Sequence, residues 1–440
     1  MKRHNIAIAA ALAAGAPLAA QASEQVTSGT DFNPAISVIL DGVYFNEFSG
    51  HAHDPAGFDG GHDHEHDHGH GHDHGLDDGF NMRHTEIVFE GTLDPYFDAN
   101  ATLAIEGTDG VALEEGYITT RALPAGLQVK AGRFFSGVGY INDKHEHDWL
   151  FVDRPLVNEH LFGDHGLQEN GVQLTWMPAT DNYLLFGLEL LQGENESVAG
   201  YVGDQGHHEN DNDDDEDEDD EIDYSLTDRP GPRLLTGFLK FGPDLGFDHA
   251  AQFGLSYGLA PHWQRAVEHG SGLEEWDGSA WFAGLDAVYK YDAGRDHGHG
   301  NLVVQAEYLY REVDVDYQRR QFDPTDASNA EGSGVSKQDG LYLQAAYGFA
   351  PRWDAGLRWE ALGLTNEALV ERDGGATTVP DHDTSYRTSL QVRYMPSEFS
   401  YLRAQFNQLD YAEDDGDRES GWEFMLQYNV SLGAHGAHSF

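Results

Sequence analysis

Histidines and carboxylates alternate in one short, glycine-rich stretch of the chain. The histidines are His51, His53, His62, His64, His66, His68, His70, His72 and His74. Neutral imidazole is a good ligand for zinc, copper and nickel, and the intervening carboxylates add negative charge. Such a run offers many interchangeable partial sites rather than one rigid tetrahedral site. We therefore expect divalent metal to bind here with high capacity and modest affinity. The alternative is a solvated loop whose histidines have no selected ligand.

A second stretch joins two histidines to a block of acidic residues. His207 and His208 precede an acidic run that extends from Glu209 to Asp223. The run lacks the glycine turn and the regular ligand spacing of an EF-hand. A like-charge block is commonly only a solvated segment. At the mouth of a pore, however, its negative potential would raise the local concentration of cations. Both interpretations stay open on the sequence.

The composition limits the partners of the chain. Across 440 residues, 77 Asp and Glu stand against 25 Lys and Arg, which gives a formal net charge of −52. This imbalance argues against nucleic acid as a partner and favours the attraction of cations. The chain has no cysteine, so no disulfide stabilises the fold. Glycines are abundant and aromatic residues reach 12 %, as suits strands joined by turns and aromatic belts at two membrane interfaces.

The first residues are typical of a secretory signal peptide. Lys2 and Arg3 precede an apolar run over 6–20, and Ala20-Gln21-Ala22 fits a small-residue cleavage pattern. We expect residues 1–22 to be the signal peptide and residues 23–440 to be one outer-membrane domain of a Gram-negative bacterium. No later run approaches the ~20 apolar residues that a membrane helix needs. A chain without such helices crosses a bilayer only as a closed β-barrel in contact with outer-membrane lipid.

Alternation with period two recurs from residue 36 to the end of the chain. In the stretch 422–432, Trp422, Leu426 and Tyr428 share one face, and Glu423 and Gln427 share the other. Residues 353–360 and 386–394 repeat the pattern. In a membrane barrel the apolar face meets lipid and the polar face meets a wet lumen. A soluble sandwich shows the same alternation, so the connections must distinguish the two.

The connections favour an all-β transmembrane antiparallel barrel of about sixteen strands. We predict strands that begin near residues 35, 83, 95, 111, 126, 166, 182, 233, 247, 279, 300, 338, 353, 385, 398 and 420. Short turns rich in proline and glycine alternate with long connections, which we place at 47–82, 134–165, 194–232, 260–278, 314–337 and 364–384. Short periplasmic turns opposite long extracellular loops are the pattern of an outer-membrane barrel. Fourteen or eighteen strands remain alternatives.

The barrel topology gives two further sets of candidate residues. The strand alternation predicts a pore lumen that contains Glu86, Glu90, Lys130, Arg358, Arg387, Arg393 and Arg403. The connection 134–165 is the third extracellular loop. If it folds inward, as the corresponding loop does in general porins, the constriction contains Lys144, His145, Glu146, His147, Asp148, Asp153, Arg154, His160 and His165. Both signs of charge would then line it, which argues against a purely anion-selective filter.

Several motifs resemble the superfamily of phosphate-selective porins O and P. They include Ala131-Gly132-Arg133-Phe134-Phe135, Asp153-Arg154-Pro155-Leu156 and Gly171-Val172-Gln173-Leu174. Asn33-Pro34-Ala35-Ile36-Ser37 and the closing 433–438 resemble a histidine-rich, zinc-associated branch of it. The resemblance spans nearly the whole mature chain and implies a sixteen-stranded, trimeric porin. Phosphate selectivity needs ladders of Arg and Lys along the lumen, and here the predicted basic residues share the lumen faces with carboxylates.

The sequence therefore predicts a porin-type channel for passive diffusion of small solutes or ions, with loops that bind or concentrate divalent metal such as zinc. No cofactor is expected to be required. A TonB-dependent metal receptor is a first alternative, although that class has about twenty-two strands and an N-terminal plug. A surface zinc-binding barrel without transport is a second. An enzyme is not expected, because no Gly-x-Ser-x-Gly nucleophile motif stands out.

Overall fold

The computed structural model describes residues 34–50, 52, 54–58, 76–105, 110–202, 225–269, 272–321, 330–368, 380–413 and 416–433. The strands are β1 (Ala35–Ser49), β2 (Gly79–Thr92), β3 (Phe97–Ile105), β4 (Val111–Thr120), β5 (Leu127–Phe135), β6 (Gln168–Trp176), β7 (Tyr183–Leu191), β8 (Leu234–Gly242), β9 (His249–His269), β10 (Gly272–Tyr291), β11 (Leu302–Gln321), β12 (Ala330–Ala350), β13 (Trp353–Glu367), β14 (Ser385–Ser397), β15 (Ser400–Ala412) and β16 (Arg418–Gly433). The short helices are η1 (Pro124–Gly126), η2 (Glu146–Asp148), α3 (Leu156–Phe162), α4 (Glu196–Ala199) and η3 (Asp296–Gly298).

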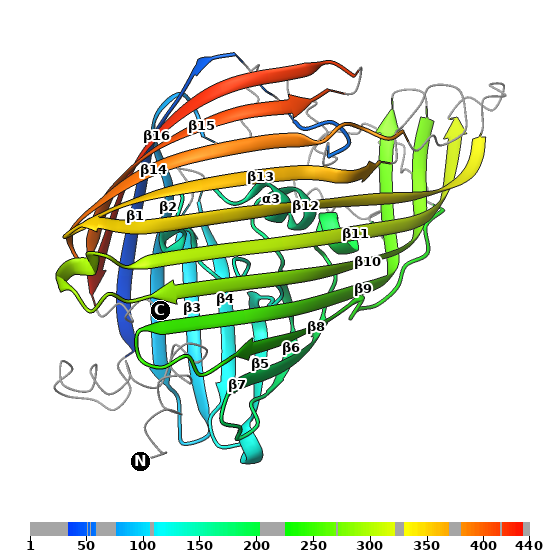
Figure 1. The fold of residues 1–440 in the computed structure, drawn as a ribbon. Helices are drawn as coiled ribbons and strands as arrows, with labels where there is room; N and C mark the ends of the chain where they lie inside the picture. The colour runs from blue at the N-terminus through cyan, green and yellow to red at the C-terminus, as the bar shows by residue number, and fades with distance from the viewer. Residues whose placement is uncertain are drawn as a thin grey trace, which may run out of the picture.

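These strands form one closed antiparallel barrel (Figure 1). Each strand pairs with its neighbours in the chain, and β1 closes the barrel against β16, from Ser37 opposite Gly433 to Ser49 opposite Trp422. The prediction of a sixteen-stranded barrel is therefore confirmed. Most predicted strand starts lie within a few residues of the observed ones, and the short turns lie where proline and glycine interrupt the alternation.

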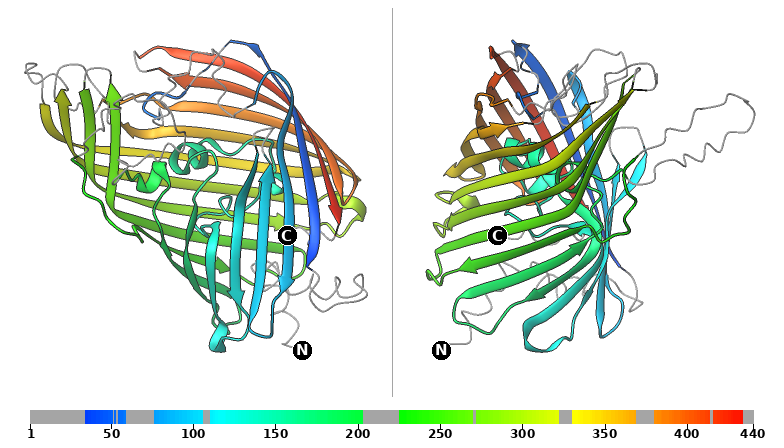
Figure 2. Two further views of the ribbon diagram at one scale, coloured as in Figure 1. Left: turned by 180° about the vertical axis from the view of Figure 1, so that it is seen from behind. Right: turned by 90° about the vertical axis from the view of Figure 1, so that its right-hand side faces the viewer.

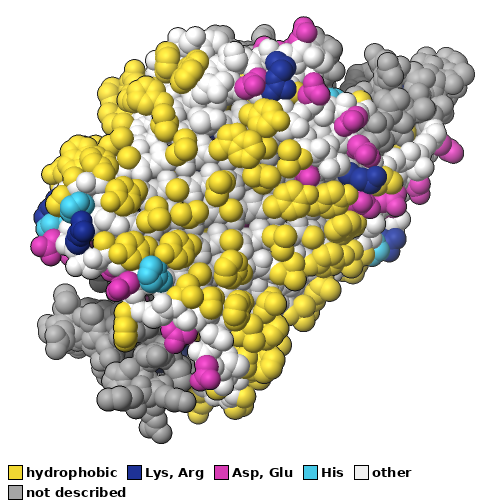
Figure 3. Space-filling model, viewed as in Figure 1, with side chains coloured by type: hydrophobic (Ala, Val, Ile, Leu, Met, Phe, Trp, Pro, Cys, Tyr) yellow, Lys and Arg dark blue, Asp and Glu magenta, His cyan; other side chains and the backbone are white. Residues whose placement is uncertain are grey.

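The two faces of the wall differ as the alternation predicts. On β16, Trp422 and Tyr428 are 47 % and 53 % exposed on the outside, whereas Glu423 and Gln427 are buried on the inside. Figure 3 shows the outer face as a broad apolar surface over the middle of the strands. Apolar outside and polar inside is the arrangement of a transmembrane barrel, and single-chain barrels of this kind lie in the bacterial outer membrane. None of the helices in the described ranges is long and apolar enough to cross a bilayer.

Aromatic side chains gather at both ends of the apolar surface. Trp353 packs on Tyr394 near the short turns, with ring centroids 4.6 Å apart. Trp359, six residues further along β13, stacks on Tyr386 at 6.1 Å. Amphipathic rings prefer the two water–lipid interfaces, so these pairs mark approximately where the membrane begins and ends.

Two of the predicted long connections are wrong. Residues 260–278 and 314–337 are mostly strand, because β9 to β12 are 20 or 21 residues long and continue beyond the apolar surface. Figure 1 shows these four strands bending away at one end of the barrel. In this extension β10 and β11 stay paired without a register shift as far as Gly272 opposite Gln321. Packing of Trp276 against Tyr317, with ring centroids 5.3 Å apart, stabilises this extension, rather than an apolar surface that faces lipid.

Candidate functional site

The connection between β5 and β6, residues 136–167, lies inside the barrel, and we call it the inner segment (Figure 2). It leaves and re-enters the wall at one point, because the Ser136 N–H donates to the carbonyl of Leu167 at 2.9 Å. The side-chain amide of Asn142 closes the same point by donating to the carbonyls of Ser136 and Leu167. Between these ends the segment reaches the opposite wall, more than 200 residues away in sequence.

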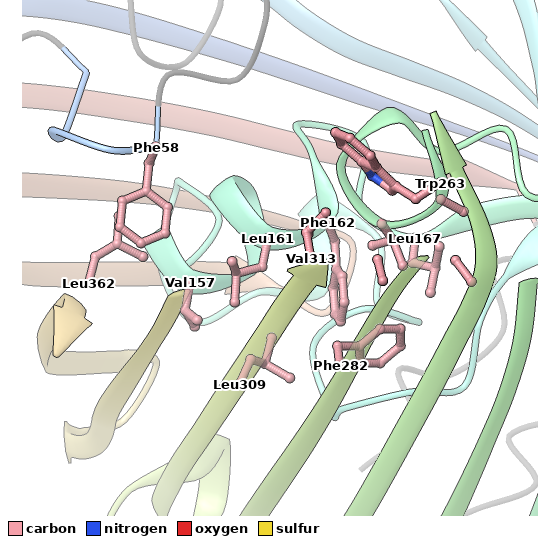
Figure 4. Close-up of a cluster of buried hydrophobic side chains, with 14 of the residues drawn as sticks. Phe58, Val157, Leu161, Phe162, Leu167, Trp263, Phe282, Leu309, Val313 and Leu362 are labelled. Carbon is pink, nitrogen blue, oxygen red and sulfur yellow. The ribbon is translucent and has the colours of Figure 1, made fainter. Parts of the chain in front are cut away.

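The helix of the inner segment is seated on the wall by apolar contacts (Figure 4). Val157, Leu161 and Phe162 of α3 are almost fully buried and belong to a cluster that includes Leu309 of β11 and Phe282 of β10. Phe162 meets Phe282 edge to face, with ring centroids 5.2 Å apart. Each fully buried side chain of this size contributes roughly 1.5–3 kcal/mol. One side of the lumen is therefore filled by packed side chains rather than by water.

A ladder of buried arginines holds the middle of the inner segment. It consists of Arg358 on β13, Arg387 on β14 and Arg403 on β15, none of them measurably exposed. Arg358 and Arg387 contact the two carboxylate oxygens of Asp153, at 2.5 and 3.1 Å. Asp153 thus bridges two guanidinium groups, and hydrogen bonds between ionised partners are stronger than those between neutral ones.

The same arginines also bind the backbone of the inner segment. Arg403 donates to the carbonyls of Trp149 and Phe151, at 2.6 and 2.8 Å. Arg387 donates to the carbonyl of Arg154 at 2.6 Å. The donors of these guanidinium groups are thus directed at the segment. A solute in the lumen does not meet them as an open cationic surface.

The first residues of the inner segment are held by carboxylates of the wall. Glu189 accepts from the N–H of Gly137 at 3.0 Å, and Glu307 accepts from the N–H of Tyr140 and of Ile141, at 2.5 and 3.3 Å. Buried backbone N–H groups need such partners where no strand pairs with them. The beginning and the middle of the segment are therefore fixed to the wall by charged groups.

Two histidines of the inner segment face carboxylates on the wall beside β2 and β4. The Nδ1 atom of His145 lies 3.4 Å from a carboxylate oxygen of Glu86 and 3.4 Å from one of Glu114. Its Nε2 atom lies 3.2 Å from a carboxylate oxygen of Glu115. His147 lies 3.1 Å from Glu86. Burial alone would lower the pKa of His145, but the surrounding carboxylates outweigh it and hold that pKa well above its usual value. The pKa of His147 is raised against burial in the same way, chiefly by Glu86.

A cavity of about 350 Å³ lies next to these histidines. Its lining includes Lys144, His145, Glu146, Arg154 and His165 of the inner segment. Groups of both signs therefore line one space beside the histidines.

The other predicted constriction residues also lie inside the barrel. Lys144 pairs with Asp143 at 3.5 Å, and Glu146 with Arg83 at 2.8 Å. Asp148 lies 3.9 Å from His147, the Arg154 guanidinium lies 4.7 Å from the centre of the Trp149 ring, and His160 meets Phe58 edge to face at 5.8 Å.

The predicted lumen residues differ in their surroundings. Glu86, Arg358, Arg387 and Arg403 are buried against the inner segment. Arg393 pairs with Asp354 at 2.7 Å, Lys130 lies over the ring of Tyr117 at 4.6 Å, and Glu90 is exposed beside Asn100. The predicted metal ligands His51, His53, His62, His64, His66, His68, His70, His72, His74, His207 and His208 lie outside the described residues.

Sequence reasoning missed several residues of this region because two β-bulges reorient them. On β2, Asp41 opposes His84 and the next pair is Gly42 with Met82, so Arg83 is an extra residue. On β4, Thr102 opposes Glu115 and Leu103 opposes Leu113, so Glu114 is extra. A bulge lets two consecutive side chains face the same side. Strict alternation would have placed Arg83 and Glu114 toward lipid.

Comparisons with known proteins show the fold and a relative. No protein-family model matches the chain. OmpT, an outer membrane protein of Vibrio cholerae, superposes with a TM-score of 0.50 at 9 % identity, covering 93 % of this chain and 100 % of that one. The outer membrane channel DcaP of Acinetobacter baumannii gives 0.48 at 12 % identity, covering 91 % and 96 %. At 9 % identity the likeness to OmpT shows a shared barrel fold alone.

A relative in Aquifex aeolicus (strain VF5) is much nearer in sequence. This protein, described as uncharacterized, is 35 % identical over 367 residues, which are 82 % of this chain and 70 % of the relative. Identity at this level over most of both chains indicates a family relationship and not only a similar fold. The chain therefore belongs to the same family as this Aquifex aeolicus protein.

Proposed function

We propose that this protein is an outer-membrane channel for passive diffusion of small solutes or ions, with a preference for cations and outer loops that concentrate divalent metal. The observation that supports it most is the inner segment, which is held by charged groups inside a closed barrel. Sixteen strands normally enclose an aqueous channel, and an inward segment narrows it. The segment contributes acidic residues in excess: six Asp and Glu against two Lys and Arg between 137 and 166.

The alternatives receive less support. TonB-dependent receptors close with about twenty-two strands, and this barrel closes with sixteen. The finer relation to porins O and P rests on the sequence motifs above, as do the zinc-associated branch and the trimer. Phosphate as the solute is disfavoured, because Arg358, Arg387 and Arg403 are engaged by the inner segment. A surface metal binder without transport would differ from a channel in conductance.

Recordings in planar lipid bilayers test the channel directly. Purified full-length protein is expected to give stepwise conductance, and the reversal potential in a KCl gradient should show cation preference. A protein that inserts, as judged by protease protection in vesicles, but never conducts would reject the proposal. Deletion of 51–74 separates the two roles further: a channel keeps its conductance and changes its response to zinc, whereas a pure metal binder loses its function.

The acidic run gives a separate prediction about selectivity. Deleting residues 209–223 is expected to reduce cation preference at low salt and to leave the conductance at high salt nearly unchanged. The reason is screening, since the Debye length falls from about 10 Å at 0.1 M to about 3 Å at 1 M salt. Reversal potentials measured at both salt concentrations check it. Replacing the same run by an uncharged Gly-Ser stretch of equal length controls for loop length, and an equal cation preference at low salt would contradict the prediction.

A further inference from the structure

Two carboxylates inside the barrel, Glu86 and Glu114, lie among histidines. In the described part of the chain, Glu86 of β2 and Glu114 of β4 form ion pairs with histidines alone. Three other buried carboxylates of the lumen pair with Arg or Lys: Asp153 with Arg358, Asp286 with Lys240 and Asp354 with Arg393. Burying two carboxylates a few ångströms apart is costly unless positive charge lies between them.

The histidines and the two carboxylates form a closed ring. His84 Nε2 lies 3.5 Å from Glu86 Oε1 and 3.5 Å from Glu114 Oε1. His145 Nδ1 lies 3.4 Å from the other oxygen of each glutamate. The potential ligand atoms of His84, Glu86 and Glu114 all lie within 4.8 Å of one another.

These separations suit a metal ion. Two nitrogen or oxygen ligands bound at about 2.0–2.2 Å and at a tetrahedral angle lie roughly 3.3–3.6 Å apart. His84 Nε2 lies 3.5 Å from one oxygen of each glutamate and His145 Nδ1 lies 3.4 Å from the other, and both separations fall in that range. A single ion between the two carboxylates would have one imidazole on each side. Two carboxylates also neutralise the charge of one divalent cation.

The surroundings of the ring hold these groups in place. Glu115 lies 3.2 Å from Nε2 of His145; with Nε2–H donating to this carboxylate, Nδ1 faces the ring as a ligand atom. Glu115 is itself fixed by the N–H of Phe135, at 3.2 Å. A carboxylate behind a ligating histidine is the usual outer partner in metal sites. On the other side, His147 Nδ1 lies 3.1 Å from Oε1 of Glu86.

Two further features of these residues favour a bound ion. Oε2 of Glu86, a residue only 1 % exposed, and Oε2 of Glu114 are buried and accept no hydrogen bond from the described residues. In addition, His84, Glu114 and His145 line the cavity of about 350 Å³, so an ion could reach them from that space. The β4 bulge supplies Glu114 to this space.

We infer that His84, Glu86, Glu114 and His145 bind one divalent transition-metal ion of the zinc type inside the barrel. The mixed nitrogen and oxygen ligands suit Zn²⁺, Co²⁺ or Ni²⁺ rather than Ca²⁺ or Mg²⁺, which prefer oxygen alone. The site goes beyond the proposed channel and beyond its outer loops, and metal binding can be measured whether or not the protein conducts.

Anomalous diffraction tests the position of the ion. Full-length protein is crystallised with one equivalent of Zn²⁺, and data are collected above and below the zinc edge. A peak is expected among the ring atoms, about 2.0–2.2 Å from each ligand. Zinc seen only at other positions would overturn the inference, because a preformed buried site should fill before scattered surface histidines.

Titration tests the residues. The full chain carries asparagine at the histidines from His51 to His74 and at His207 and His208, which removes the other predicted histidine ligands, and is titrated with Zn²⁺ in detergent. The tightest binding step is expected to weaken by more than about 100-fold in the double variant Glu86→Gln, Glu114→Gln. Glu90→Gln is the matched control on the same face of β2, where no histidine pairs with the carboxylate in the described structure.

A second variant keeps the test decisive if the double variant fails to assemble. His145→Asn changes only the inner segment and leaves the strands intact. It is expected to weaken the same binding step and to abolish the anomalous peak, while the barrel keeps its heat-stable migration on gels. An unchanged affinity in His145→Asn would reject this residue set, as would equal loss in Glu90→Gln.

Discussion

Replacing Asp153 with asparagine is expected to destabilise the folded barrel by about 3–5 kcal/mol and to raise its mean conductance. The substitution keeps the shape of the side chain and removes its charge. Arg358 and Arg387 would then remain buried with one counterion fewer, and both would share Glu360. Loss of one partner of a buried pair costs more than the pair contributed, because the other charge stays away from water.

The inner segment should loosen as a result, so its motion should appear as larger current fluctuations. Stability is measured by the urea midpoint of unfolding in detergent, and conductance in planar bilayers. Asp143→Asn is the matched control in the same segment. Its carboxylate is about half exposed and lies 3.5 Å from Lys144, so its loss should cost only about 0–1 kcal/mol. Equal effects of the two substitutions would show that Asp153 does not hold the segment.

The barrel could be predicted because each membrane-spanning strand carries its own signal. Residues 353–360 alternate so clearly because Trp353, Leu357 and Trp359 meet lipid while Asp354 and Arg358 meet the lumen. The signal is local and needs no knowledge of distant contacts. It fails where β9 to β12 leave the membrane. There Trp276 packs on Tyr317 and Arg320 pairs with Glu275, so these strands need no apolar, lipid-facing side chains.

The candidate site is harder to predict, since its contacts join distant parts of the chain. The motif Asp153-Arg154 and the histidines His145 and His147 mark the inner segment in the sequence. Nothing local, however, indicates that Asp153 meets Arg358 and Arg387. The inward orientation of Arg83 and Glu114 could not be predicted for another reason: in each strand a bulge shifts the alternation by one residue. The adjacent pair Glu114-Glu115 is the one available hint, since one of two neighbouring carboxylates would otherwise face lipid.

Excising the inner segment is expected to have the largest effect on transport. Residues 137–166 can be replaced by a short Gly-Ser turn, because the Ser136 N–H already donates to the Leu167 carbonyl at 2.9 Å. The deletion removes α3 from the lumen and leaves a wider aqueous path. A several-fold rise in single-channel conductance is the expected result, as in sixteen-stranded barrels without a filled interior.

The same deletion is also expected to shift selectivity toward anions. It takes away more acidic than basic residues and uncovers Arg358, Arg387 and Arg403, whose donors now bind the segment. Reversal potentials with KCl and with potassium phosphate measure the shift. Adding Arg387→Gln and Arg403→Gln to the deletion should reverse it while keeping the high conductance. A deletion that conducts more but stays equally cation-selective would show that the arginine ladder does not govern ion choice, whereas unchanged conductance would show that the segment does not narrow the pore.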